Sequence, residues 1–140
     1  MKNKSWTNGP LLLERRKNHS SCAIQSEDGS TQSIIIVGGA ILQGSGLGYA
    51  STTEILHSKA PKWVQGPELP LGISNASCVA LPPTSDIACI VVGGETSRAG
   101  RFSGRTFSSY VYGLNRRLTE WTLLGTIRTG RFSHIALPIS

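Results

Sequence analysis

The sequence predicts an all-β fold built from repeated units of four short antiparallel strands. Tryptophan recurs at nearly constant intervals of 57 and 58 residues, at Trp6, Trp63 and Trp121. The apolar run that ends in Gly38-Gly39 recurs 55 residues later and ends in Gly93-Gly94. Glycine, proline and serine are abundant between the short apolar runs, and no stretch shows the 3.6-residue spacing of an amphipathic helix. Self-similarity at a fixed period is the sequence signature of a repeat architecture.

The second copy shows the expected order of strands most clearly. Its first strand covers 78–81 and is followed by a tight turn at 82–85. The second strand, 87–92, is apolar throughout, which is typical of a strand buried on both faces. A loop rich in Gly, Ser and Arg follows, the third strand covers 107–112, and the fourth strand carries Trp121.

The first copy repeats this order with a hairpin turn at 27–29. Its second strand is predicted at 34–37, its third at 53–56, and its fourth carries Trp63. The boundaries of the units follow from this phase. Residues 1–18 supply the last strand of a preceding unit and a connecting loop, 19–66 and 76–124 form two units, and 131–140 begin another. We therefore expect the chain to pack against remaining units of a longer parent chain.

Two further positions recur in phase with the tryptophans. Residues that repeat in this way are usually structural, so the histidines are expected to pack or to bond a turn backbone and not to bind a metal. The glycine pairs permit positive φ and a close backbone approach after a buried strand. Each tryptophan is expected to lie between neighbouring units. The position ten residues after each Trp holds Arg16, Ile73 and Arg131, and the position thirteen after holds His19, Ala76 and His134.

Four antiparallel strands per unit, with Gly-Gly and Trp at fixed places, describe a β-propeller blade. The sequence resembles the kelch repeat family in its Arg-x-x-His segments at 16–19 and 131–134, its strands ending in Gly-Gly, and Tyr112 in the third strand. The resemblance covers essentially the whole chain and implies an incomplete kelch-type propeller. The middle copy departs from the pattern at Ile73 and Ala76. The first copy is expected to carry Ile55 and Leu56 in place of the third-strand Tyr.

Composition and motif spacing exclude several classes of function. The net charge is +6, yet the chain has no lysine-rich arm and no interleaving of basic and aromatic residues, so nucleic-acid binding is not expected. No apolar run is long enough to span a membrane, and Leu11–Leu13 is too short for a signal-peptide core. The glycine-rich stretch 38–48 lacks the GxGxxG spacing of a dinucleotide site. We predict no cofactor and no metal.

The three cysteines, Cys22, Cys78 and Cys89, include no CxxC pair, so a zinc site is not expected. Counting outward from the turn at 82–85 places Cys78 opposite Cys89. Such a pair can form a cross-strand disulfide or remain as two buried thiols. Because Cys22 is assigned to the same place in the first copy, with Ile34 opposite, the sequence favours buried free thiols.

The predicted function is recognition of a protein partner, without chemistry and without catalytic residues. In a four-strand meander, the loops between strands two and three share an end with the connections between units. Arginine presents a forked, permanently charged donor that suits carboxylates, so these residues are expected to form a basic rim for a partner with acidic segments. The arginines expected there are Arg98, Arg101 and Arg105 in the first set of loops and Arg16 and Arg131 in the second.

Alternatives remain open at this point. Arginines in a solvated Gly/Ser loop can bind nothing at all. In kelch-repeat ubiquitin-ligase adaptors this face holds the substrate, so the resemblance implies a similar use here. It also leaves open an enzyme built on a longer kelch propeller, of the copper oxidase or sugar isomerase type, including a secreted one.

Overall fold

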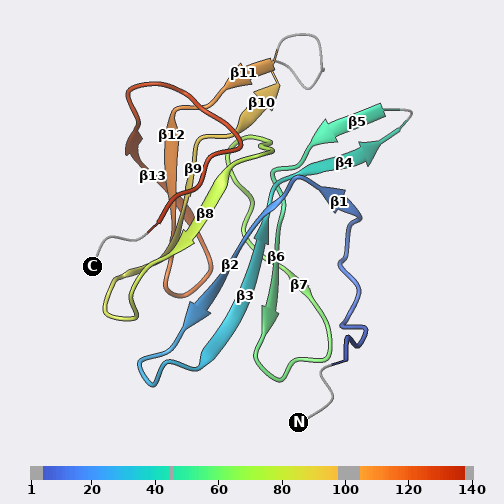
Figure 1. The fold of residues 1–140 in the computed structure, drawn as a ribbon, viewed down its shortest axis with the longest axis vertical. Helices are drawn as coiled ribbons and strands as arrows, with labels where there is room; N and C mark the ends of the chain where they lie inside the picture. The colour runs from blue at the N-terminus through green and yellow to red at the C-terminus, as the bar shows by residue number, and fades with distance from the viewer. Residues whose placement is uncertain (1–4, 45, 98–104, 138–140) are drawn as a thin grey trace.

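The computed structural model describes residues 5–44, 46–97 and 105–137, and these residues form strands and no helix. Two four-stranded antiparallel sheets dominate the fold (Figure 1). In each sheet the four strands pair in chain order, which confirms the predicted all-β class. The first sheet contains β2 (Ser20–Gln25), β3 (Thr31–Val37), β6 (Thr53–His57) and β7 (Val64–Gln65). The second sheet contains β8 (Ser77–Ala80), β9 (Ile87–Val92), β12 (Tyr110–Asn115) and β13 (Trp121–Thr126).

The segments expected to be loops after each glycine pair contain short strands instead. β4 (Ala40–Gln43) and β5 (Gly46–Tyr49) form a hairpin, and β1 (Arg16–Lys17) pairs with β4. In the second copy β10 (Glu95–Ser97) pairs with β11 (Arg105–Phe107). The predicted third strand at 107–112 is therefore divided between β11 and β12. The Ser108 amide turns away from both strands and donates to the Gly94 carbonyl at 2.8 Å.

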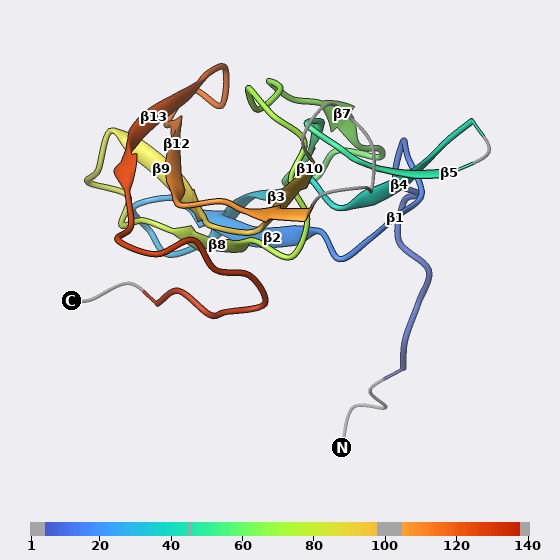
Figure 2. The same ribbon diagram turned by 90° about the horizontal axis from the view of Figure 1, so that it is seen from above.

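The hydrophobic core lies between the two sheets (Figure 2). Ile24, Ile35 and Ile55 from the first sheet belong to one buried cluster with Val91 and Leu114 from the second. Because the apolar faces of the two sheets meet there, neither sheet buries its apolar side chains alone, as expected of repeat units. Within the described residues there is no helix of the length and apolarity needed to cross a membrane.

Two of the three tryptophans occupy equivalent buried places, and the third does not. The Trp63 indole N–H donates to the Pro10 carbonyl at 3.1 Å, and the Trp121 indole N–H donates to the Pro67 carbonyl at 3.1 Å. Trp63 and Trp121 are 8% and 7% exposed, as predicted, whereas Trp6 is 102% exposed. The expectation that Trp6 is packed like the others is therefore wrong for this chain. Pro10 and Pro67 each stand four residues after a Trp, so a matching proline for Trp6 would precede residue 1.

The glycine pairs have the predicted conformation in both copies. Gly38 and Gly93 have φ of 66°, and Gly39 and Gly94 have φ of 96° and 98°. A side chain at Gly38 would collide with the carbonyl of Ile73, because the backbone of the next connection passes directly over it. The following glycine of each pair donates its amide to that connection. Gly39 bonds the Ile73 carbonyl and Gly94 the Arg131 carbonyl, each at 2.7 Å.

A chain of backbone hydrogen bonds joins equivalent turns of successive copies. Asn18, Asn75 and Ser133 have positive φ of 56°, 54° and 51°. The Asn75 amide donates to the Asn18 carbonyl at 2.9 Å, and the Ser133 amide donates to the Asn75 carbonyl at 2.9 Å. Asparagine tolerates this left-handed conformation better than most residues. The sequence reasoning had attached no role to these positions.

The predicted pairing of the cysteines is wrong by two residues. Cys78 lies opposite Val91, and Cys89 lies opposite Ala80. The turn is longer than predicted, because the Leu81 amide donates to the Ala88 carbonyl instead of pairing with Asp86. The assumed equivalence of the first two cysteines is also wrong. Ser20 pairs with Val37 as Ser77 pairs with Val92, so the counterpart of Cys22 is Val79. All three cysteines are free thiols in the structure.

Candidate functional site

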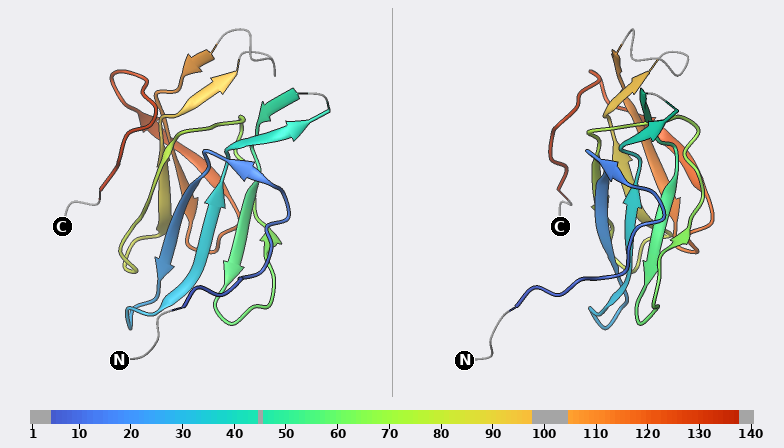
Figure 3. Two further views of the ribbon diagram at one scale, coloured as in Figure 1. Left: turned by 45° about the vertical axis from the view of Figure 1, so that its right-hand side comes forward. Right: turned by 90° about the vertical axis from the view of Figure 1, so that its right-hand side faces the viewer.

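The two ends of the sheets differ in the segments they carry (Figures 1 and 3). One end, here called the loop end, carries the β4–β5 and β10–β11 hairpins and the connections at 66–76 and 127–134. The opposite end, here called the turn end, carries the turns at 26–30, 58–62, 82–86 and 115–120. The hairpins between the second and third strands thus share an end with the connections between sheets, as the meander order predicts.

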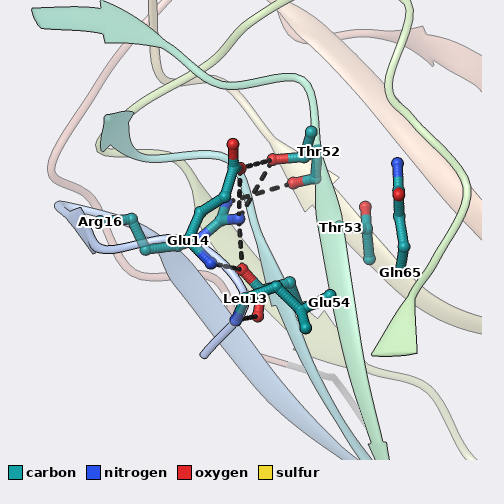
Figure 4. Close-up of a pocket in the computed structure, with 7 residues that line it drawn as sticks. All are labelled: Leu13, Glu14, Arg16, Thr52, Thr53, Glu54 and Gln65. Carbon is teal, nitrogen blue, oxygen red and sulfur yellow. Dashed lines mark hydrogen bonds and ion pairs between the residues drawn. The ribbon is translucent and has the colours of Figure 1, made fainter. Parts of the chain in front are cut away.

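Arg16 was expected on the loop-end rim, but the structure buries it (Figure 4). The Arg16 side chain is 0% exposed and forms ion pairs with Glu54 at 2.6 Å and Glu14 at 3.1 Å. Its guanidinium also donates to the Gly38 carbonyl at 2.7 Å and the Thr52 hydroxyl at 3.1 Å. A partner at the surface cannot contact this group. The assignment of Arg16 to partner binding is therefore wrong, and its role is to join β1 to β6.

Glu54 anchors the N-terminal segment as well. Its carboxylate accepts hydrogen bonds from the Leu13 amide at 2.7 Å and the Glu14 amide at 3.1 Å. A cavity of about 160 Å³ beside these groups is lined by Thr53, Gln65 and the ion-pair residues. Since the carboxylates and the guanidinium already bond one another, this cavity offers a ligand few free polar groups, and we regard the cluster as structural.

His19 and His134 have the structural surroundings that their phase predicted. Their side chains lie against Gly39 and Gly93, the glycines of the preceding strand ends. Burial, and then the positive charge of Arg16, lowers the pKa of His19, while Glu54 opposes this shift. Burial and then the charge of Arg131 lower the pKa of His134. Both imidazoles are therefore mainly neutral at pH 7.

The other predicted rim arginines have different standings. Arg131 is exposed, and its backbone carbonyl fixes the Gly94 amide. Arg105 begins β11 and pairs with Ser97 through the backbone. Arg98 and Arg101 lie outside the described residues, in the segment that links β10 to β11. Of the arginines predicted from the sequence, Arg131 is thus the one whose described side chain is available at the loop end.

Further cations at the loop end escaped the sequence reasoning. Arg15, Lys17 and Arg128 are exposed there beside Arg131. The acids of this end are mostly occupied, because Glu14 and Glu54 pair with Arg16. Glu95 is buried and accepts the Tyr49 hydroxyl at 2.8 Å. Glu68 is exposed and accepts the Ser51 hydroxyl at 3.2 Å.

The turn end is balanced in charge. It carries four acids and four bases, so the excess positive charge of the described chain belongs to the loop end. The acids are Glu27, Asp28, Asp86 and Glu120, and the bases are Lys59, Lys62, Arg116 and Arg117.

A cavity of about 190 Å³ opens at the loop end where the first copy meets the second. The exposed Lys17 and the β5 residues Leu47 and Tyr49 form part of its lining, and Ser74 and Glu95 of the second copy form another part. Asn18 and Asn75, whose backbones are bonded to each other, complete it. These residues lie far apart in the sequence, so no local motif marks the cavity.

Comparison with known proteins identifies the fold but no family. No protein-family model matches the chain, and no curated protein matches it by sequence. Among solved structures it is similar to one described as "Structure of YjhT", with a TM-score of 0.75 and 15% identity. The similarity covers 94% of this chain and 45% of that one, so the chain spans less than half the length of this structural relative. At this identity the likeness concerns the fold alone.

Proposed function

We propose that the chain is part of a kelch-type β-propeller and that its two main sheets are adjacent blades. The meander order of both sheets, the repeated glycine pairs and the equivalent Trp–Pro hydrogen bonds support this arrangement. A structural relative more than twice as long is consistent with further repeats in the complete assembly. Closed propellers contain roughly four to eight blades.

The loop end of this scaffold binds a protein partner that carries an acidic segment. One observation carries this proposal: the exposed cations Arg15, Lys17, Arg128 and Arg131 gather at the loop end, whereas charges at the turn end balance. Loops held by a rigid scaffold are the usual place for recognition. Arginine and lysine side chains there attract carboxylates and steer a partner toward this face.

The proposed recognition works by charge and shape and involves no chemistry. The β4–β5 and β10–β11 hairpins stand on either side of the loop-end cavity, so a partner segment can lie between them and reach the cations. Arg98, Arg101 and Arg105 add three positive charges to the segment that joins β10 to β11. As part of this proposal, the partner is a substrate of a ubiquitin-ligase adaptor, the use to which the kelch resemblance points.

The experiment compares two variants with equal loss of charge. The loop-end variant combines Lys17→Ala, Arg128→Ala and Arg131→Ala, and the turn-end control combines Lys59→Ala, Lys62→Ala and Arg117→Ala. All six side chains are exposed, so neither variant removes a core contact. Biosensor binding of a glutamate-rich peptide, at several salt concentrations, measures the association and dissociation rates.

We expect the loop-end variant to associate more slowly and to lose most of its salt dependence, because screening acts on the charges that steer encounter. The turn-end control should behave like the unmodified protein. A third variant, with Arg98, Arg101 and Arg105 changed to Ala, tests the hairpin segment. Equal association rates for the loop-end and turn-end variants would refute the proposal.

A further inference from the structure

The three cysteines, which come from different strands, gather at the seam between the two sheets. Cys22 lies on β2, Cys78 on β8 and Cys89 on β9. The Cys78 thiol donates to the Cys22 sulfur at 3.0 Å, and all three sulfurs lie within 4.8 Å of one another. Cys89 is 0% exposed, whereas Cys22 and Cys78 are half-buried, so the cluster can be reached from one side.

Strand alternation explains why the sulfurs converge. Successive side chains on a strand point to opposite faces, so a shift of one place moves a side chain to the other face. Cys78 and Cys22 are displaced by one place between equivalent strands, since the counterpart of Cys22 is Val79. The two thiols therefore face each other across the seam. Cys89 lies opposite Ala80, two residues beyond Cys78, so it shares the face of Cys78.

We propose that these three cysteines form a trigonal thiolate site for a soft monovalent metal ion, Cu(I), that joins the two sheets. Three atoms no farther apart than 4.8 Å all lie within about 2.8 Å of a common point, close to a metal–sulfur bond of ~2.3 Å. A small inward movement of the side chains completes the coordination. Thiolates select soft ions such as Cu(I), and the sequence signal of this site is hidden because its ligands are 56 and 11 residues apart.

The donor set favours Cu(I) over zinc. Structural zinc sites are almost always tetrahedral and require four ligands. Within the described residues, no further His, Cys, Asp or Glu joins the three sulfurs. A three-coordinate geometry suits Cu(I), whose filled d shell imposes no fourth ligand.

The surroundings favour a thiolate at Cys22. Hydrogen bonds from Cys78 and Cys89 lower the pKa of Cys22 to about 5. The hydrogen bond to Cys22 raises the pKa of Cys89, as burial does, while the positive charge of Arg116 acts in the opposite direction. Each thiol that becomes a ligand releases one proton to solvent, so Cu(I) affinity must fall as pH falls.

The test titrates the reduced chain anaerobically with Cu(I) in competition with a copper chelator. We expect one Cu(I) per chain, three sulfur neighbours by X-ray absorption, and protection of all three cysteines from alkylation as read by mass spectrometry. Each change of a cysteine to Ser should weaken binding by more than the roughly 10–100-fold that loss of a second-shell partner costs. Ala23→Ser, an exposed neighbour of Cys22 on the same strand, is the control and should bind normally.

Several results would overturn the proposal. Alkylation of all three thiols at the same rate with and without Cu(I) would show that no site forms, and this readout needs no variant. Unchanged affinity in Cys89→Ser would leave a two-sulfur site. A single free thiol in the unreduced, denatured chain would reveal a disulfide between the other two. Binding of Zn²⁺ as tightly as Cu(I) would refute the choice of ion.

Discussion

The two main sheets fill the same place in the repeat with opposite chemistry. In the first copy this place holds the buried ion pair of Arg16 with Glu54. In the second copy the equivalent positions hold Ile73 and Tyr112, which are 1% and 5% exposed. Glu54 pairs with Ile36 and Tyr112 pairs with Val91, each two residues before a glycine pair, so the two are counterparts.

This comparison corrects one expectation and explains two departures. The counterpart of Tyr112 is Glu54, and the predicted Ile55 and Leu56 are wrong. The middle copy lacks the repeat arginine because its partner position is aromatic, and the first copy lacks the tyrosine because its partner position is acidic. The repeat thus fixes the shape of the backbone, while each pair of facing side chains is chosen together.

The tryptophans offer the largest test of the shared backbone. Trp63→Ala removes a buried indole and its hydrogen bond to Pro10, and should destabilise the protein by about 3–5 kcal/mol. Trp6→Ala, at the exposed counterpart, should change stability by less than about 0.5 kcal/mol. Urea unfolding of both variants measures the difference. Similar losses in the two variants would contradict the contrast between the copies.

The ion pair should show a dependence that the apolar pair lacks. Glu54→Ala leaves the Arg16 charge buried without its main partner and should cost about 3–5 kcal/mol. Glu54→Gln keeps the shape and removes only the charge, and serves as the control for packing. A loss below about 1 kcal/mol for Glu54→Ala in urea unfolding would show that the ion pair is not the stabilising element.

The inner and outer faces of the sheets should differ in association. Between the sheets the tryptophans are buried, whereas the outer flanks expose Leu11 at 89%, Leu42 at 74% and Leu123 at 52%. β7 and β13 are edge strands of their sheets. Exposed apolar flanks and open edges favour assembly, so the 140-residue chain alone should self-associate. Sedimentation and thermal unfolding are the checks, and a monodisperse monomer that melts cooperatively would contradict this expectation.

The smallest expected effect concerns the histidines. The folded state lowers the pKa of His19 and His134, so it binds fewer protons than the unfolded state below pH 6.5. Stability should therefore be constant above this pH and fall as pH decreases below it. Replacing both histidines with Gln should flatten this part of the stability curve. The middle copy carries Ala76 at this place and makes no contribution.

Repetition decided how far the sequence could be read. Burial of Trp63 and Trp121, the glycine conformations and the order of four strands were predictable because each recurs in phase. Burial of Arg16 was not, because it depends on Glu54, 38 residues away. An acid inside the apolar run 53–56 was the available signal, since buried carboxylates are almost always paired. The cysteine cluster was hidden because the turn at 82–86 shifted the register.

The most direct test transfers the pair of the second copy into the first. Arg16→Ile and Glu54→Tyr are made singly and together, and the free energy of unfolding is measured for each. If facing side chains are chosen together, each single change is strongly destabilising and the double variant recovers most of the loss. The coupling energy should then lie at or above the roughly 0.5–3 kcal/mol seen for contacting residues. Additive losses, with the double variant the least stable of the three, would contradict the account.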